Sequence, residues 1–443
     1  MVQKDLTTVA VVGLGKIGLP LAVQYAQHGK RVIGCDINPQ VVETINAGRS
    51  HVQEEPELAI ELPRLVREGL LSATINTTEA ARQADVVVVI VPVVIDAQQE
   101  VNFRAIDAAT AAIGKGLQPG TLVSYETTLP VGTTSQRFAQ ILEQQSGLKA
   151  GQDFFLAYSP ERVSSGHIFR DLRIYPKVIG GIDEKSTAAA LSFYQSVLDA
   201  ETITMTSTDE AEFVKLIETT YRDVNIALAN EFARFADTHG LNVASAIAAA
   251  NTQPYSHIHT PGVGVGGHCI PVYPYFLLAG CTDQHPGSQQ SMLSIPRYAR
   301  RINDSMAEYA VERLQAVIGP LKDQFILILG VAYRGNVRET AFTSAQLLQK
   351  ALLASGASVY VDDPLYSTEE LRALGYTPLT PEVEGEIRAI ILQADHQIYQ
   401  SFDFSRFNHC QVVLDGRRAL RREQIEALGI DYITVGDGTY KKI

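Results

Sequence analysis

The sequence predicts an α/β protein with an N-terminal doubly wound domain, a central domain built on one long helix, and a C-terminal α/β domain. Three observations favour this arrangement. Apolar strand-like runs alternate with helical stretches over residues 8–206, an unbroken amphipathic stretch follows, and the alternation restarts at Gln324. We expect the three domains to cover residues 1–206, 207–318 and 319–443.

Short runs of apolar and β-branched residues mark the strands of the first domain. Residues 85–91 are apolar almost throughout, which is typical of a strand in a parallel sheet covered on both faces. A helical stretch that ends at Gly29 separates the first two strands. The strands expected in this domain are residues 8–12, 31–35, 85–91, 121–125, 154–158, 177–179 and 202–205.

A capping box at Ser207 and Glu210 predicts the start of the central helix, because each side chain can bond to the other residue's free amide. No helix breaker occurs before Gly240. At ~1.5 Å per residue such a helix is roughly 45 Å long, more than one small domain can cover, so it either bridges domains or forms a homodimer interface. Its apolar residues recur at steps of three and four, at Val214, Ile217, Tyr221, Val224, Leu228, Phe232 and Phe235.

The C-terminal domain repeats the alternation of strands and helices. A helix expected over residues 341–355 has Gly356 as its stop. The turn at residues 330–335 follows the first strand but lacks the dinucleotide pattern, so the residues leave open whether it binds a nucleotide. The expected strands are residues 325–329, 358–361, 387–393 and 411–414.

Composition indicates a globular chain. Of 443 residues, 46% are hydrophobic and 19% charged, and 49 acidic against 37 basic residues give a net charge of −12. No basic run occurs, which argues against nucleic acid or an anionic membrane as a partner. No apolar run approaches the ~18 residues of a membrane span, and a strand begins too early for a signal peptide, so we expect a cytoplasmic protein.

Four scattered cysteines are too few for a disulfide framework: Cys35, Cys269, Cys281 and Cys410. Cys269 follows four glycines in residues 261–268, which lets backbone and ligand approach a thiol. Taken alone, this pattern allows an inert cysteine, a nucleophile or a zinc ligand. His257 and His259 would share a strand face near it, but adjacent His268 and Cys269 suit tetrahedral coordination poorly, so we expect no metal.

Gly13, Gly15 and Gly18 fit the dinucleotide fingerprint G-x-G-x-x-G, after a strand and before a helix, and Asp36 ends the next strand. The glycines let the backbone approach a pyrophosphate, to which the helix N-terminus offers amides. Asp36 would accept hydrogen bonds from an adenosine ribose and repel a 2′-phosphate, which favours NAD over NADP. The first domain is therefore predicted to be of the Rossmann type.

Several motifs follow one another along nearly the whole chain. They are residues 11–20 (VVGLGKIGLP), 126–134 (ETTLPVGTT), 159–163 (SPERV), 215–218 (KLIE), 222–227 (RDVNIA), 230–231 (NE) and 264–271 (GVGGHCIP). Together they resemble the UDP-glucose/GDP-mannose dehydrogenase family, and most of all the branch that oxidises UDP-N-acetylhexosamines at C6. The resemblance implies an NAD-binding domain, a dimerising central helix and a C-terminal UDP-sugar-binding domain. It implies four-electron oxidation of the C6 alcohol of a UDP-N-acetylhexosamine, with ManNAc or GlcNAc as the sugar, for surface polysaccharide precursors.

The resemblance also assigns catalytic roles. Cys269 would capture the aldehyde as a thiohemiacetal and carry the acid as a thioester. Lys215 would steady the oxyanion and depress the thiol pKa, Thr219 would donate to the same oxyanion, and Glu161 would activate water or move a proton. Thr128 would lie beside the nicotinamide and the catalytic water.

The same resemblance supplies the binding residues. Cofactor-binding residues would be Gly13, Gly15, Lys16, Ile17, Gly18, Asp36, Pro92 and Thr128. Substrate-binding residues would be Glu161, Arg162, Val163, Lys215, Arg222, Tyr255, His259, Gly264, Gly266, Gly267, Tyr333 and Arg338.

Three departures from the family pattern point to a divergent subgroup. Tyr273 stands where an Asp is usual, Thr219 where an Asn is usual, and the C-terminal motif is shortened to residues 333–340. The loss of the Asp leaves the base assignment open. Other readings are the same chemistry on UDP-glucose, a nucleotide-sugar sensor that binds NAD without catalysis, and a two-electron hydroxyacid dehydrogenase. The yield of NADH per substrate molecule separates these hypotheses: two for either UDP-sugar oxidation, none for the sensor and one for the hydroxyacid dehydrogenase. A panel of UDP-sugars separates the two UDP-sugar oxidations.

Overall fold

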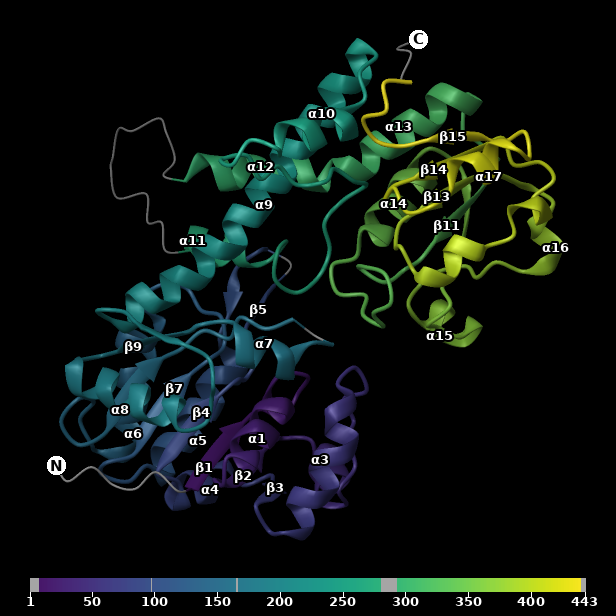
Figure 1. Cartoon of the computed structure of the whole chain (residues 1–443). Coiled ribbons are helices and arrows are strands. Elements are labelled where there is room, and N and C mark those ends of the chain that lie inside the picture. The colour runs from purple at the N-terminus through teal and green to yellow at the C-terminus, as the bar shows by residue number, and fades with distance from the viewer. Residues whose placement is uncertain (1–7, 97, 165, 280–292, 440–443) are drawn as a thin grey trace. The chain divides into compact units, whose positions relative to one another are not determined.

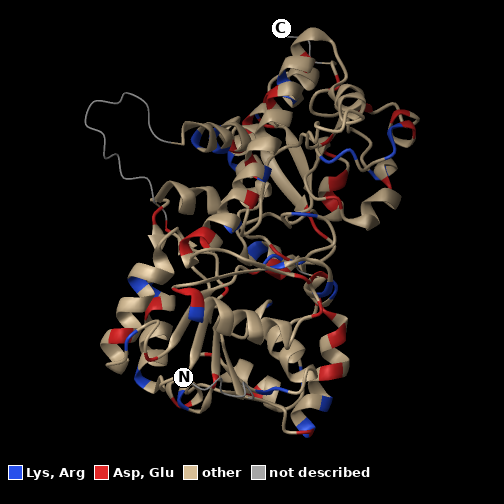
Figure 2. Ribbon diagram, turned by 60° about the vertical axis from the view of Figure 1, so that its left-hand side comes forward, with Lys and Arg blue, Asp and Glu red and all other residues tan. Residues whose placement is uncertain are grey.

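The computed structural model describes residues 8–96, 98–164, 166–279 and 293–439, which form two compact units. The first unit lies within Met1–Glu218 and Tyr275–Thr282, and the second within Thr219–Pro274 and Asp283–Ile443. Each unit contains a sheet with helices packed around it (Figure 1), which confirms the predicted α/β class. Acidic and basic residues are interspersed along both units (Figure 2).

An eight-stranded sheet with the order β10-β9-β8-β7-β4-β1-β2-β3 forms the centre of the first unit. The strands are β1 (Thr8–Val12), β2 (Arg31–Cys35), β3 (Leu71–Thr74), β4 (Val86–Val89), β7 (Leu122–Tyr125), β8 (Phe155–Tyr158), β9 (Lys177–Gly181) and β10 (Thr202–Thr204). A separate hairpin pairs β5 (Val94–Ile95) with β6 (Val101–Asn102). Every expected strand is present, with bounds shifted by at most a few residues; β3 was not predicted, because residues 71–74 carry a weak apolar pattern.

Helices cover both faces of this sheet, as doubly wound topology requires. One face packs in a single apolar core against α1 (Gly18–Gln27), α3 (Pro56–Arg67), α7 (Ile168–Ile174) and α8 (Glu184–Gln195). The mutually packed α4 (Thr77–Gln83), α5 (Arg104–Gly116) and α6 (Ala139–Ser146) form another layer. The remaining helices are α2 (Pro39–Asn46) and the π-helical η1 (Thr133–Phe138).

The apolar strand β4 is parallel to both of its neighbours, β1 and β7, as its composition predicts, but the sheet as a whole is not wholly parallel. β9 pairs antiparallel with β8, with Tyr158 opposite Gly180, and β10 follows the direction of β9. Antiparallel neighbours are joined at the same end of a sheet. Residues 159–176 therefore leave and re-enter at the carboxyl end of β8, which keeps Glu161 at the edge where the other strand ends carry functional loops.

The long helix α9 (Thr208–His239) runs for 32 residues and stops before Gly240, whose φ of +68° suits glycine. Only half of the predicted capping box forms. The Glu210 amide donates to the Ser207 hydroxyl at 3.1 Å, but the Glu210 carboxylate accepts from the amide and hydroxyl of Thr206, each at 2.7 Å. The Glu210 carboxylate therefore binds the residue before Ser207 instead of the Ser207 amide that a capping box would use.

A five-stranded parallel sheet with the order β12-β11-β13-β14-β15 forms the centre of the second unit. The strands are β11 (Phe325–Leu329), β12 (Ser358–Asp362), β13 (Ile387–Leu392), β14 (Val412–Asp415) and β15 (Asp431–Ile433), the last of which was not predicted. The helices and short 3-10 turns are α10 (Val243–Ala250), α12 (Ser294–Asp304), α13 (Met306–Ile318), α14 (Ser344–Ala354), α15 (Thr368–Ala373), α16 (Pro381–Glu384), α17 (Arg422–Glu426), η2 (Gln397–Ser401) and η3 (Phe404–Arg406). The short helix α11 (Tyr273–Ala279) follows the cysteine loop.

The helix predicted over residues 341–355 begins later, at Ser344, because Thr343 caps it by accepting from the Ala345 amide. Residues 330–343 are therefore a loop, which we call the β11–α14 loop. Among the described residues, helices lack the combination of length and apolar character that crossing a bilayer demands.

Candidate active site

The dinucleotide fingerprint lies between the end of β1 and the start of α1, where the strand order of the first sheet reverses. A Cβ on Gly13 would lie 2.9 Å from the Ile90 carbonyl oxygen, and one on Gly18 would lie 1.8 Å from the Gly13 carbonyl oxygen. Both positions therefore require glycine. A Cβ on Gly15 would meet nothing within 4 Å, so this glycine leaves open space where a pyrophosphate can approach the backbone.

Asp36 connects the end of β2 to this turn. Its carboxylate accepts from the Leu14 amide at 3.1 Å and from the Asn38 amide at 2.9 Å. A carboxylate has about four acceptor positions, so two remain for ribose hydroxyls. Lys16 forms an ion pair with Glu54 at 2.9 Å, a contact between the turn and the segment before α3 that the sequence did not indicate. The turn and Asp36 together fit an NAD molecule.

Thr128 and Pro92 lie just beyond the ends of the neighbouring strands β7 and β4. The Thr127 hydroxyl donates to the Val91 carbonyl at 2.8 Å, which holds the two strand ends together. Thr128 is buried and Pro92 is exposed. The structure thus places both predicted cofactor residues at the carboxyl edge that also carries the fingerprint.

Lys215 of α9 meets Glu161 in the first unit. The lysine Nζ donates to the backbone carbonyl of Glu161 at 2.6 Å. Desolvation raises the pKa of the half-buried Glu161 carboxyl, against the opposing positive charge of Lys215. A carboxyl with a raised pKa beside an ammonium group is suited to proton transfer.

Glu212 and Glu218, the acidic residues within one turn of Lys215 on α9, have partners in other segments. Glu212 accepts from the Gly132 amide at 2.6 Å, and Glu218 pairs with Arg162. Arg162 also donates to the Pro176 carbonyl at 3.0 Å, and the Val163 amide donates to the Glu161 carboxylate. Residues 161–163 are therefore held to α9 and to the segment before β9.

The glycine-rich loop before Cys269 packs against the β11–α14 loop in the second unit. A Cβ on Gly264 would lie 2.8 Å from the Ser344 hydroxyl oxygen. One on Gly266 would lie 2.8 Å from Tyr333 Cβ, and one on Gly267 3.1 Å from the Tyr333 ring. The glycines therefore allow Tyr333 to lie against the backbone of the cysteine loop, so four predicted substrate residues come together.

Cys269 differs from the other described cysteines. It is half-buried, and its carbonyl accepts from the Tyr273 amide at 2.9 Å, at the start of α11. Cys35 and Cys410 are buried, and burial raises the pKa of each thiol to about 12. Such thiols are inert at neutral pH, which leaves Cys269 as the candidate nucleophile among them. Cys281 lies outside the described residues.

The histidines near the cysteine loop do not share a strand face, which corrects the expectation for His257 and His259. Both lie in an irregular segment whose backbone is bound by Asn225: its side-chain amide donates to the His257 carbonyl at 2.6 Å and accepts from the His259 amide at 3.0 Å. His268 pairs with Glu339 at 3.4 Å. Across the described ranges, we find no cluster of three His, Cys, Asp or Glu residues suited to a metal ion.

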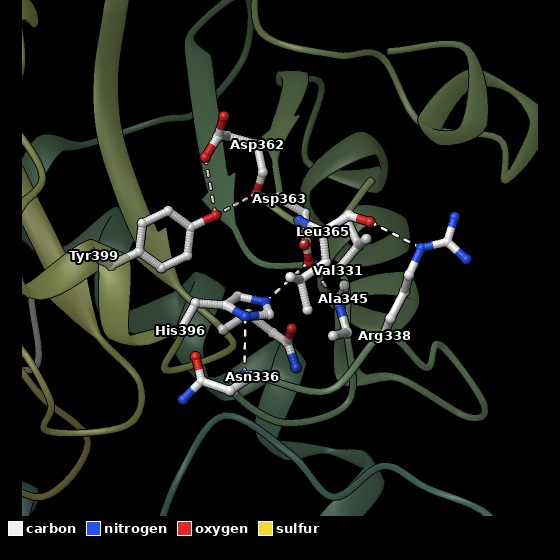
Figure 3. A network of polar contacts seen from close by, with 12 residues as sticks. Val331, Asn336, Arg338, Ala345, Asp362, Asp363, Leu365, His396 and Tyr399 are labelled. Atoms are coloured by element: carbon white, nitrogen blue, oxygen red, sulfur yellow. Dashed lines mark hydrogen bonds and ion pairs between the residues drawn. The ribbon is translucent and has the colours of Figure 1, made fainter. Parts of the chain in front are cut away.

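Other predicted substrate residues are not gathered within the second unit. Tyr255 is 90% exposed, and Arg222 is exposed on α9. Arg338 donates to the Leu365 carbonyl at 2.9 Å (Figure 3). It also pairs with Glu370. Thr219 lies buried on the part of α9 that belongs to this unit.

Arg417 is a candidate site residue that the sequence analysis missed. Burial lowers its pKa, and its Nε donates to the Gln393 carbonyl at 2.5 Å. A Cβ on Gly262 would lie 3.7 Å from Arg417 Nη1, so the guanidinium lies next to the glycine-rich loop. An arginine held there can bind an anionic group. Its position just after the apolar strand β14 was the available signal.

A fingerprint turn, an acidic residue after β2 and a half-buried cysteine on a glycine-rich loop are typical of an NAD-dependent dehydrogenase. Comparison with known proteins gives the family. Its NAD binding domain matches residues 7–198, its central domain residues 209–305 and its UDP binding domain residues 327–422. The chain belongs to the UDP-glucose/GDP-mannose dehydrogenase family, and it is an NAD-dependent nucleotide-sugar dehydrogenase.

Relatives and solved structures agree with this assignment. The chain is 35% identical to UDP-N-acetyl-D-mannosamine dehydrogenase of Pyrococcus horikoshii, over 94% of this chain and 97% of the relative. It is 33% identical to NDP-N-acetyl-D-galactosaminuronic acid dehydrogenase of Ralstonia nicotianae, over 96% and 98%. A solved UDP-D-ManNAc dehydrogenase from Pyrococcus horikoshii superposes with a TM-score of 0.87 at 32% identity, covering 98% of this chain and all of the other.

Proposed function

We propose that the protein oxidises the C6 alcohol of a UDP-N-acetylhexosamine to the carboxylate through a covalent intermediate on Cys269. The observation that carries the proposal is the placement of this half-buried thiol in a loop that packs against Tyr333 of the UDP binding domain. The names of the Pyrococcus and Ralstonia relatives, which are dehydrogenases of N-acetylated sugars, support this substrate class.

Oxidation of an alcohol to a carboxylate removes four electrons and consumes one water. NAD bound at the fingerprint turn would supply the hydride acceptor for both oxidations. The Cys269 thiolate adds to the C6 aldehyde and forms a thiohemiacetal, which loses the second hydride and becomes a thioester. Water then attacks the thioester carbon, and the thiolate leaves to give the carboxylate. The overall yield is two NADH per sugar.

In this proposal Glu161 accepts the proton of the attacking water, and Lys215 stabilises the oxyanions formed at C6. Burial favours the protonated form of Glu161, and the positive charge of Lys215 opposes that shift. The pair therefore resembles an acid–base couple tuned towards neutral pH. Thr219 would donate a hydroxyl to the same oxyanion, and Thr128 would orient the water.

We also propose domains with the limits 1–206, 207–318 and 319–443, and a homodimer formed through α9. We place the protein in the cytoplasm, where thiols stay reduced, as a supplier of uronic acid sugars for surface polysaccharide. The apolar stripe of α9 supports the dimer, because five of its seven residues are exposed: Ile217, Tyr221, Leu228, Phe232 and Phe235.

A substrate panel tests the proposal. Purified protein with NAD is assayed against UDP-ManNAc, UDP-GlcNAc, UDP-GalNAc and UDP-glucose, and NADH is counted per sugar consumed. We expect two NADH with one or more of the N-acetylated sugars. A yield of one NADH per sugar would contradict the thioester route. No turnover would favour a nucleotide-sugar sensor that binds NAD without catalysis, and a preference for UDP-glucose would favour oxidation of that sugar instead.

A further inference from the structure

Asp363 binds the beginning of the β11–α14 loop. It follows β12, and its Oδ2 accepts from the amides of Val331 at 2.7 Å and Ala332 at 3.1 Å. In the first unit, Asp36 follows β2 and accepts from the Leu14 amide at 3.1 Å in the same way. In both domains, an acid that follows the second strand along the chain thus holds the turn that follows the first strand.

The two acids differ in what else they meet. Asp36 is only half-buried, whereas the Asp363 side chain is 0% exposed. His396 covers Asp363: its Nε2 lies 3.1 Å from Asp363 Oδ2, and its side chain is 1% exposed (Figure 3). Asp363 therefore has no surface for a ribose hydroxyl, so the C-terminal domain cannot use it as the first domain uses Asp36.

The hydrogen bonds of His396 fix its tautomer. The Asn336 amide donates to His396 Nδ1 at 3.0 Å, so Nδ1 carries no hydrogen in this arrangement. The neutral ring then holds its proton on Nε2 and donates it to Asp363. This bond and those from backbone amides hold the pKa of Asp363 below its ordinary value, although burial opposes ionisation.

Residues next to His396 hold the middle of the loop. The Gly335 amide donates to Asp395 Oδ1 at 3.0 Å, and the Gln397 amide donates to Asn336 Oδ1 at 3.0 Å. A Cβ on Gly335 would lie 2.2 Å from the Asp395 carbonyl oxygen, so the two segments are in close contact. His396 thus joins the middle of the loop, through Asn336, to the carboxylate that holds its beginning.

Tyr333 lies between these two fixed points. Its amide donates to the Glu339 carbonyl at 2.9 Å, and its ring packs on Gly266 and Gly267 of the cysteine loop. The Gly267 amide also donates to the Ala341 carbonyl at 2.8 Å. The position of Tyr333, and with it the contact to the cysteine loop, therefore depends on how firmly the β11–α14 loop is held.

We propose that His396 is a positioning residue for the nucleotide-sugar site, which orders the β11–α14 loop by accepting from Asn336 and donating to Asp363 at once. The inference rests on the proposed function, since it takes this loop to bind the nucleotide sugar. His396 does not touch substrate in this role. Its loss should weaken binding of the uridine nucleotide and leave NAD binding in the other unit unchanged.

Two substitutions separate the halves of the role. His396→Asn keeps an acceptor close to the Nδ1 position, and His396→Gln keeps a donor close to the Nε2 position. Asp395→Ala loosens the same loop from its exposed side without touching the buried pair. His409→Asn changes an exposed histidine of the same domain and is the matched control.

The measurements are UDP affinity by calorimetry, KM for UDP-N-acetyl-D-mannosamine and for NAD, kcat, and the melting temperature. We expect each His396 variant to raise the UDP Kd and the sugar KM about tenfold, Asp395→Ala to raise them less, and His396→Ala to raise them most. KM for NAD should stay within about twofold, and His409→Asn should match wild type.

If the His396 and Asp395 variants fold and bind UDP as tightly as wild type, the proposed function is not overturned but the role of His396 is. Equal losses for UDP and NAD would also overturn it, because they would indicate general destabilisation. If His396→Ala fails to fold, the results for His396→Asn and His396→Gln, which each keep part of the contacts, decide. Wild-type protein that binds no UDP would instead overturn the proposed function.

Discussion

Lys177 and Glu126 form a buried ion pair in the first unit. The lysine Nζ lies 2.6 Å from Glu126 Oε2, and the side chains are 7% and 0% exposed. The hydroxyls of Tyr25 and Tyr194 donate to the other carboxylate oxygen at 3.0 and 2.8 Å. The Glu161 amide donates to the Glu126 carbonyl at 3.2 Å, so this network supports the strand end that carries the candidate acid–base residue.

Breaking this pair should destabilise the protein strongly, because the remaining charge would be buried without a partner. We expect Lys177→Met or Glu126→Gln to lower the free energy of unfolding by about 3–5 kcal/mol in urea titrations. Asp107→Asn, which breaks an exposed pair with Arg137, is the control and should cost less than about 1 kcal/mol. Similar small losses for all three variants would contradict the prediction.

Asp36 should decide the choice of cofactor. Its negative charge repels a 2′-phosphate, so wild type should use NAD far better than NADP. Asp36→Asn removes the charge but keeps one acceptor oxygen for the Leu14 or Asn38 amide. We expect the ratio of kcat/KM for NAD over NADP to fall about tenfold or more, which corresponds to about 1.4 kcal/mol. Equal turnover of both cofactors by wild type would remove this role.

Cys269→Ser should abolish net oxidation of the alcohol, since an alkoxide leaves an ester far less readily than a thiolate leaves a thioester. Mass spectrometry of wild type with slowed hydrolysis should detect a covalently attached sugar. A serine variant that makes NADH at a near-normal rate would eliminate the covalent mechanism.

The general base can be identified by comparing two variants. Tyr273 has a phenol that stays protonated near neutral pH, so we expect Glu161 to activate water. Glu161→Gln should slow thioester hydrolysis by roughly 10²–10⁴, and Tyr273→Phe much less, as measured by single-turnover kinetics. If Tyr273→Phe is the more damaging change, the base assignment is wrong while the thioester route remains.

Glu212 should make stability depend on pH. Burial raises the pKa of its carboxyl from 4.5 to about 7, against hydrogen bonds from Thr134 and Gly132. Between these values the folded chain keeps a proton that the unfolded chain has released, so stability falls as pH rises. The stabilisation from the Glu212 proton is complete below the pKa of 4.5 in the unfolded chain and is lost above the pKa of about 7 in the folded chain. The free energy of unfolding changes by about 3 kcal/mol between these limits.

Glu212→Gln should flatten this part of the profile when the free energy of unfolding is measured from pH 4 to 8. The matched control is Glu210→Gln on the same helix, because hydrogen bonds from Thr206 hold the pKa of the exposed Glu210 low. That variant should keep the wild-type slope over this window. Parallel profiles for wild type and Glu212→Gln would show that the raised pKa is absent.

The exposed apolar residues of α9 predict a dimer that a single charge can disrupt. Phe232 is 40% and Tyr221 61% exposed, although both belong to the apolar stripe. Sedimentation velocity at micromolar concentration should show a dimer or a multiple of it for wild type, and a shift towards monomer for Phe232→Glu. Ile60→Glu, on α3 and 73% exposed, should leave the assembly unchanged. A monomeric wild type would refute the dimer.

Local pattern was enough to predict most strands of the two large sheets and the long helix α9, but not β3 or β15. The observed bounds Thr8–Val12, Arg31–Cys35 and Phe325–Leu329 are those expected from the sequence, and α9 extends to the predicted stop at Gly240. Each of these elements depends on residues a few positions apart in the sequence. Such residues share one face of the strand or helix, or terminate it. The fingerprint turn was also predictable, because its glycines, the helix and Asp36 follow one another along the chain.

Contacts between distant segments were decided only by the tertiary structure. The reversed direction of β9, the hydrogen bond from Lys215 to the Glu161 carbonyl and the packing of Tyr333 on Gly267 each join residues that no local period relates. The sequence by itself determined which residues can form strands, helices and a dinucleotide turn, since these follow from backbone sterics and side-chain periodicity. The partners of Lys215, His396 and Tyr333 depend on how whole elements pack, because a buried polar group or ring can contact only the residues that the fold places beside it.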